Sequence, residues 1–110
     1  MQNPITVRGS MVTRPLPVQT KQAAVVLGGH LATWRKLQGL TAEQVAQRAG
    51  TTRQTLGKLE RGDASVGMAV LLNVARALGQ LSVLIDALDP YNSAVGLARV
   101  DEILPKRVRQ

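Results

Sequence analysis

Apolar side chains recur at helical spacing in the first half of the chain. From Gln22 onward they lie three or four positions apart, which predicts the buried face of a long helix that ends at Gly39. Within it, Gly28 and Gly29 weaken the helix by about 1 kcal/mol each relative to alanine. Trp34 falls on the apolar face and is expected in the core. The complete face consists of Ala24, Leu27, Leu31, Trp34 and Leu37.

Two shorter helices are predicted next, each with its own start and stop signals. Thr41 precedes the first, and Gln44 follows three residues later at the spacing of a capping box. Thr52 stands at the N-cap position of the second helix, and the two helices end at Gly50 and Gly62. The residues expected to face inward are Val45, Ala46, Ala49, Leu56 and Leu59.

Helical spacing continues through the remaining apolar part of the sequence. Residues 66–79 predict a fourth helix. Residues 81–88 (LSVLIDAL) fit a helix at four apolar positions and strand alternation at three, which favours a fifth helix that ends at Asp89 and Pro90. A short helix is also compatible with residues 93–104, and the fold class is all-α. The inward residues predicted for the fourth helix are Met68, Leu71, Leu72, Ala75 and Leu78.

The chain divides into three stretches of different character. Residues 1–20 contain three prolines and no apolar period, so they predict a flexible leader. Residues 21–89 hold the five predicted helices. Residues 90–110 form a C-terminal tail that ends in basic residues.

Charge is distributed unevenly along these 110 residues, whose net charge is +7. Residues 21–62 hold seven lysines and arginines against two glutamates, whereas residues 63–89 hold one arginine against three aspartates. A basic half joined to a mildly acidic, apolar half indicates a polyanion on one face and a protein contact elsewhere.

Composition excludes several classes of function. The chain has no cysteine and a single histidine, His30, so it lacks a ligand set for zinc, and no apolar run reaches the roughly 20 residues that span a bilayer. Asp86 and Asp89 are two carboxylates close together in the sequence, as in some catalytic pairs, but they flank a helix end without a histidine or lysine nearby. We therefore expect a cytoplasmic, nucleoid-associated protein that is not an enzyme and needs no metal or cofactor.

The stretch GTTRQTLGKLERG, residues 50–62, has an unusual outer face for a surface helix, because its single acid is Glu60 at the far end. Two short helices joined by a tight turn form a helix-turn-helix, in which the second helix enters the DNA major groove with its first residues against base edges. Arginine and glutamine there can bond guanine and adenine through two hydrogen bonds each. The outward residues are Arg53, Gln54, Gly57 and Lys58, flanked by Thr55, with Thr51 and Thr52 at the helix N-terminus where a phosphate is favoured.

The stretch GLTAEQVAQRAGTTRQTLGKLERG resembles the helix-turn-helix of the Xre/lambda-repressor-like family, and the resemblance covers about residues 22–88. It implies a five-helix lambda-repressor-like DNA-binding domain, with an ion pair between Arg35 of the first helix and Glu60 of the recognition helix. The family usually carries a side chain where this chain has Gly57. The phosphate contacts that the resemblance implies are Thr41, Gln44, Thr51 and Arg61.

The tail DPYNSAVGLARVDEILPKRVRQ is similar to the tails of regulators encoded beside Hip-type serine/threonine kinase toxins. Such regulators are antitoxins that dimerise, repress their own operon and bind the kinase. The similarity implies three partners: operator DNA, a second copy of the chain and a HipA-like kinase toxin. Two alternatives stay open, a stand-alone phage-type or restriction-modification controller repressor and a coactivator scaffold that bridges proteins and hardly reads DNA.

A homodimer is expected because one recognition helix covers too few base pairs for useful specificity. Two-fold related half-sites lie one helical turn of DNA apart, or a multiple of it. Residues 81–88 contain more apolar side chains than a small monomer can bury, which places the dimer contact there. The predicted interface residues are Leu81, Leu84, Ile85 and Leu88.

Overall fold

The computed structural model describes residues 14–103, which form six α-helices and one 3-10 turn and contain no β-strand. The all-α prediction is confirmed for these residues. Residues 81–87, whose apolar positions fit both helical and strand spacing, form a helix. The helices number six rather than five, because the predicted tail contains α7. The elements are α2 (Val18–Leu37), α3 (Ala42–Ala49), α4 (Arg53–Glu60), α5 (Met68–Ala77), α6 (Leu81–Ala87), η1 (Pro90–Asn92) and α7 (Ala94–Ile103).

The start of α2 at Val18 precedes the Gln22 start that the apolar pattern predicts. Pro17 occupies the N-cap position, and the backbone amide of Lys21 donates to the Pro17 carbonyl at 3.1 Å. The side chains of this first turn are exposed, so no periodic burial marks it in the sequence. The earlier part of the predicted leader, residues 1–13, lies outside the described residues.

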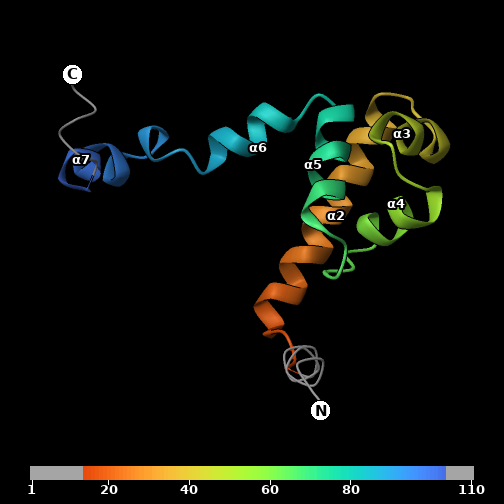
Figure 1. The fold of residues 1–110 in the computed structure, drawn as a ribbon, viewed down its shortest axis with the longest axis horizontal. Coiled ribbons are helices and arrows are strands. Elements are labelled where there is room, and N and C mark those ends of the chain that lie inside the picture. Colours follow the sequence, from red (N-terminus) through yellow and green to blue (C-terminus); the bar gives the residue numbers. More distant parts are fainter. Residues whose placement is uncertain (1–13, 104–110) are drawn as a thin grey trace, which may run out of the picture.

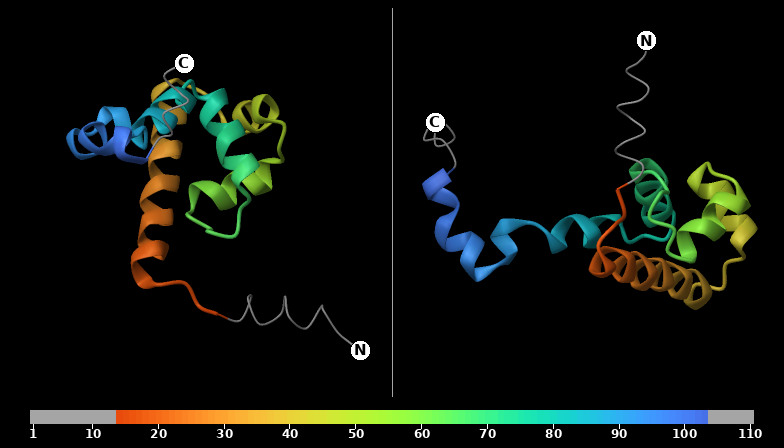
Figure 2. Two further views of the ribbon diagram at one scale, coloured as in Figure 1. Left: turned by 60° about the vertical axis from the view of Figure 1, so that its left-hand side comes forward. Right: turned by 90° about the horizontal axis from the view of Figure 1, so that it is seen from below.

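Helices α2 to α5 pack around one core, and the remaining elements lead away from it. Figure 1 shows α3 and α4 beside one end of the bundle and α6 and α7 extending to the opposite side. The two further views in Figure 2 show the same extension. Helix α6 contacts α5, and α7 packs on η1. We call residues 81–103, from α6 through α7, the C-terminal arm.

The core consists of small and branched apolar side chains from all four packed helices. The face of α5 that meets α3 is centred on Val74, which is fully enclosed. Met68 and Leu72 were expected to face inward, and this prediction is wrong, because both side chains lie on the exposed side of α5. The buried cluster contains Leu31, Val45, Ala46, Ala49, Leu56, Leu59, Val74 and Leu78.

The inward face of α2 also differs from the predicted one. Leu31 is buried, but Trp34 keeps 40% of its surface exposed, so its assignment to the core is wrong. Helix α4 crosses α2 at Gly28, where an added Cβ would lie 2.2 Å from the backbone oxygen of Leu59. The contact face therefore runs through Gly28, Leu31 and Arg35. Because glycine has no side chain, it does not appear in the apolar pattern of the sequence. The predicted apolar face therefore lies at a different angle around α2 from the face that packs against α4.

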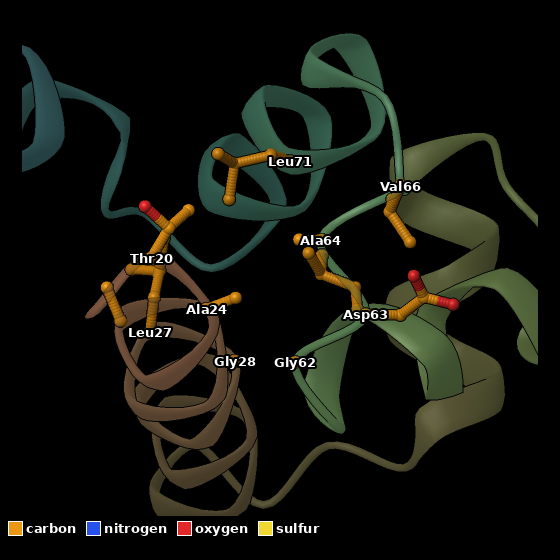
Figure 3. A pocket seen from close by; sticks show the side chains of 11 residues that line it. Thr20, Ala24, Leu27, Gly28, Gly62, Asp63, Ala64, Val66 and Leu71 are labelled. Atoms are coloured by element: carbon orange, nitrogen blue, oxygen red, sulfur yellow. The ribbon is translucent and has the colours of Figure 1, made fainter. Parts of the chain in front are cut away.

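The crossing of α2 and α4 is close because both backbones carry glycine there. Figure 3 shows Gly28 of α2 opposite Gly62, which follows α4, at an apolar hollow that Leu27 and Leu71 also line. Gly62 has a φ of +85°, and an added Cβ would lie 2.4 Å from the Cα of Val25. The two glycines thus set how near α4 lies to α2.

Candidate nucleic-acid interface

The start of α3 is fixed by two reciprocal hydrogen bonds. The backbone amide of Gln44 donates to Thr41 Oγ1 at 3.1 Å, and the amide of Thr41 donates to Gln44 Oε1 at 2.9 Å. The predicted capping box is therefore confirmed. Both side chains are exposed at a helix N-terminus, where the helix dipole favours an anion.

The turn between α3 and α4 is short and tightly bonded. Gly50 has a φ of 67° and caps α3 in the left-handed region, and the amide of Thr51 donates to the Ala46 carbonyl at 2.9 Å. Thr52 Oγ1 then accepts from the amide of Thr55 at 3.0 Å and donates to Thr55 Oγ1 at 2.9 Å. The Thr52 hydroxyl thus holds the first turn of α4 together.

Helix α4 turns its apolar side to the core and its polar side to solvent. Leu56 and Leu59 are buried, which leaves the opposite side of the helix free to contact another molecule. Of the residues predicted to contact DNA, Thr51 and Thr55 are half-buried, and the exposed ones are Thr41, Gln44, Thr52, Arg53, Gln54, Lys58 and Arg61.

A shallow hollow lies on this outer surface between α4 and the start of α3. It is lined by Arg53, Gln54, Gly57, Arg61 and Ala42. Two of these residues carry guanidinium groups and none carries a carboxylate. The structure therefore brings Arg53, Gln54 and Arg61 together on one cationic surface.

Arg35 and Glu60 join the end of α2 to the end of α4. Arg35 Nε donates to Glu60 Oε2 at 2.8 Å and Nη2 donates to Oε1 at 3.1 Å, while Nη1 donates to the Leu40 carbonyl at 3.1 Å. The hydrogen bond to Glu60 raises the pKa of Arg35, against the opposing effect of burial. Only 15% and 14% of the two side chains are exposed. The single acid of α4 is thus neutralised inside the protein, which leaves the outer face cationic.

The loop after α4 carries a carboxylate close to basic side chains. Asp63 Oδ1 accepts hydrogen bonds from the Ser65 hydroxyl at 2.6 Å and from the Ser65 amide at 2.9 Å. These bonds, with a smaller contribution from the charges of Lys58 and Arg61, hold the pKa of Asp63 below its usual value. Asp63 is therefore ionised at neutral pH, and its Oδ1 atom is engaged by Ser65.

The residues predicted for the dimer contact lie on α6 and at its C-cap, at the base of the C-terminal arm. Leu81 and Leu84 are half-buried, and Ile85 and Leu88 are exposed. Leu88 keeps 87% of its surface exposed. Leu84 also lines an apolar hollow with Trp34 of α2 and Ala75 of α5. Within the described chain, most of the apolar surface of Ile85 and Leu88 is exposed.

Two features of this surface were missed by reasoning from the sequence. Ala42 at the start of α3 lines the hollow, although an alanine carries no chemical signal of its own. Gly57 and Arg61 lie four residues apart and share the hollow, a spacing that places two positions on the same side of a helix. That spacing was the available signal for their proximity.

Other kinds of site are not found in the described residues. Between residues 14 and 103 no group of three or more histidine, aspartate or glutamate side chains is placed to hold a metal ion. No helix in the same part of the chain is long and apolar enough to cross a membrane.

Comparison with known proteins identifies relatives of this helical core. A family model described as helix-turn-helix matches residues 31–84. An uncharacterized HTH-type transcriptional regulator of Methanothermobacter thermautotrophicus is 48% identical over 46 residues, which cover 42% of this chain and 67% of the relative. One of Sinorhizobium fredii is 39% identical over 54 residues, which cover 49% of this chain and 70% of the relative. No solved structure matches the chain significantly. The chain therefore belongs to the Xre-like helix-turn-helix family of transcriptional regulators.

Proposed function

We propose that this chain is a sequence-specific DNA-binding repressor that places α4 in the major groove. The observation that carries the proposal is the exposure of Arg53 and Gln54 on the first turn of a helix that the rest of the domain holds rigidly. The bond between Arg35 and Glu60 and the close crossing with α2 fix that helix. An arginine and a glutamine on a helix held in this way suit the paired acceptor and donor groups of guanine and adenine.

Phosphate contacts are proposed for the starts of α3 and α4. Thr41, Gln44 and Thr51 lie at the N-termini of α3 and α4, where backbone amides and the helix dipole favour an anion. Thr55 and Lys58 flank the base-reading residues on α4. Phosphate contacts position a protein on the duplex and carry no sequence information themselves.

Arg53→Ala is expected to weaken binding to the preferred operator by about 1–3 kcal/mol and to relax the preference at one base pair per half-site. The side chain is exposed, so the domain should stay folded. Fluorescence anisotropy with operator and shuffled duplexes across a salt series measures both effects. Arg99→Ala removes an exposed guanidinium from the C-terminal arm and controls for net charge.

Two results would contradict this role. An equal loss of affinity for operator and shuffled DNA would make Arg53 an electrostatic anchor that reads no sequence. An intact protein without salt-dependent affinity for any duplex would favour the alternative of a scaffold that bridges proteins.

We propose that the repressor is a homodimer whose contact includes α6. Ile85 and Leu88 are exposed there, and Leu81 and Leu84 continue the apolar surface toward the core. A two-fold dimer would present two copies of α4 to half-sites one turn of DNA apart, or a multiple of it.

Ile85→Glu is therefore expected to give a folded monomer with weak operator binding, because a charge in an apolar contact loses its water without gaining a partner. Analytical ultracentrifugation measures the oligomeric state. Met68→Glu serves as the control, since Met68 is also an exposed apolar side chain but lies on α5. If Ile85→Glu stays dimeric, the contact lies on another surface.

We further propose that this regulator is the antitoxin of a Hip-type module and binds a HipA-like kinase. The support is the tail resemblance together with exposed apolar side chains at Val95, Leu97 and Ile103 of α7, which suit a protein partner. The motif LPKRVR, residues 104–109, lies outside the described residues. A kinase gene beside this one, whose product co-purifies with the regulator, would support the antitoxin role over a stand-alone repressor.

A further inference from the structure

Gly57, in the middle of the recognition helix, leaves a space that the side chain of Arg61 fills. A Cβ added at Gly57 would lie 3.0 Å from Arg61 Nη1, 3.8 Å from its Cζ and 4.0 Å from its Nη2. Arg61 is the C-cap residue of α4. Its guanidinium therefore lies back over the helix and does not extend beyond the helix end.

Helix geometry explains why this arrangement needs a glycine. Side chains tilt toward the helix N-terminus, so the side chain of Arg61 covers the surface one turn earlier, at Gly57. A Cβ at that position would force the guanidinium to shift by a few tenths of an ångström, and a longer side chain would displace it further. The position of the guanidinium thus depends on the absence of a side chain at Gly57.

The guanidinium of Arg61 consequently shares one surface with the residues proposed to read bases. Arg61 and Gly57 line the same hollow as Arg53 and Gln54. Asp63, the nearby acid, accepts its hydrogen bonds from Ser65 and makes no ion pair with Arg61 in the described residues.

We propose that Arg61, which the family resemblance implies as a phosphate contact, is instead a base-reading residue that uses the space over Gly57 to reach the floor of the major groove, a role that rests on the proposed DNA-binding function. A guanidinium on the outer side of an inserted helix faces base edges, whereas one beyond the helix end faces the phosphates. The planar fork of arginine matches the O6 and N7 acceptors of guanine. Gly57 is then a specificity-determining position, because it decides where Arg61 points.

The test compares base preferences, obtained by selecting binding sites from a randomised duplex pool, for the full chain and its variants. Arg61→Lys keeps the charge and removes the fork, and it should lower discrimination at one base pair per half-site about tenfold or more. Its affinity for random duplex should stay close to that of the parent protein, because the positive charge remains.

Gly57→Ala should reduce discrimination at the same base pair, since its methyl group would lie 3.0 Å from Nη1 of Arg61 and would shift the guanidinium. Alanine is also the better helix residue, so the melting temperature should rise by roughly 2–8 °C, which separates the loss of reading from unfolding. Gly29→Ala is the matched control, because a Cβ there meets open space in α2 and base preferences should not change. In the Arg61→Lys background, Gly57→Ala should have no further effect on discrimination.

The possible failures are distinguishable. If Arg61→Lys leaves every base preference unchanged, the proposal is overturned and Arg61 contacts phosphate. If Gly57→Ala alters a different base pair from Arg61→Lys, the coupling between the two residues is overturned. If the parent protein selects no sequence from the pool, the proposed DNA-binding function itself fails.

Discussion

Glu60→Gln is expected to lower the free energy of unfolding by about 3 kcal/mol. The substitution leaves the guanidinium of Arg35 largely enclosed without a countercharge, and breaking a buried pair typically costs on the order of 3–5 kcal/mol. The lower end of that range applies because 15% and 14% of the two side chains remain exposed. Urea unfolding followed by circular dichroism measures the change.

The ion pair between Arg99 and Glu102 provides a matched control for this result. Its Nε and Oε1 atoms lie 3.5 Å apart, and 71% and 63% of the side chains are exposed. Water solvates such exposed charges in both the folded and the unfolded protein. Glu102→Gln should therefore change the free energy of unfolding by less than about 1 kcal/mol. Equal effects of the two substitutions would contradict the structural role assigned to Glu60.

The consequences of Glu60→Gln should extend to DNA binding. The carboxylate of Glu60 bonds the end of α4 to Arg35 of α2. Without it, α4 is held less firmly in its orientation relative to α2. At a temperature where the variant is fully folded, operator affinity should fall although neither residue belongs to the proposed DNA-contacting set. Lower affinity would then reflect weaker positioning of α4 and no lost contact.

Gly28→Ala is expected to destabilise the domain by about 1–3 kcal/mol, although alanine is intrinsically the better helix residue. A Cβ at Gly28 would lie 2.2 Å from the Leu59 oxygen, 2.9 Å from the Glu60 oxygen and 3.0 Å from the Gly62 nitrogen. All three atoms belong to the backbone, so α4 must move away from α2 to admit the methyl group. Thermal unfolding measures the loss, at about 4–8 °C for each kcal/mol in a domain of this size.

The neighbouring glycine of α2 supplies the control for this prediction. A Cβ at Gly29 meets no atom within 4 Å, so Gly29→Ala should stabilise the protein by about 0.5–1 kcal/mol through helix propensity alone. The two substitutions are chemically identical and adjacent, yet their effects should have opposite signs. If Gly28→Ala also stabilises the protein, the helices do not cross at this residue.

Features that depend on near neighbours in the chain could be predicted from the sequence. The bonds that start α3 and α4 join Thr41 to Gln44 and Thr52 to Thr55, three residues apart. Such bonds form where a threonine stands just before a helix, because its side chain and the free amide are already within reach. The same local reach explains why Gly50 was recognised as the end of α3. These elements required no knowledge of the rest of the fold.

Contacts between residues that are distant in the sequence could not be predicted from local patterns. Arg35 and Glu60 are 25 residues apart, and only resemblance to a known family suggested that they meet. The burial of Trp34 was predicted from helical periodicity and was wrong. Periodicity shows that a helix has an apolar side, but it does not show where a neighbouring helix crosses.

The start, the end and the threonine cap of α4 follow from short-range chemistry in residues 41–62. The position of that helix on the domain depends on tertiary packing, since it requires the glycine backbones at Gly28 and Gly62 to meet α4 and α2 closely. The place of the Arg61 guanidinium over Gly57 is likewise a property of the folded helix surface. In each case the deciding feature is the absence of a side chain at a glycine. Which atoms fill the space that the glycine leaves depends on how the neighbouring elements pack in the folded protein.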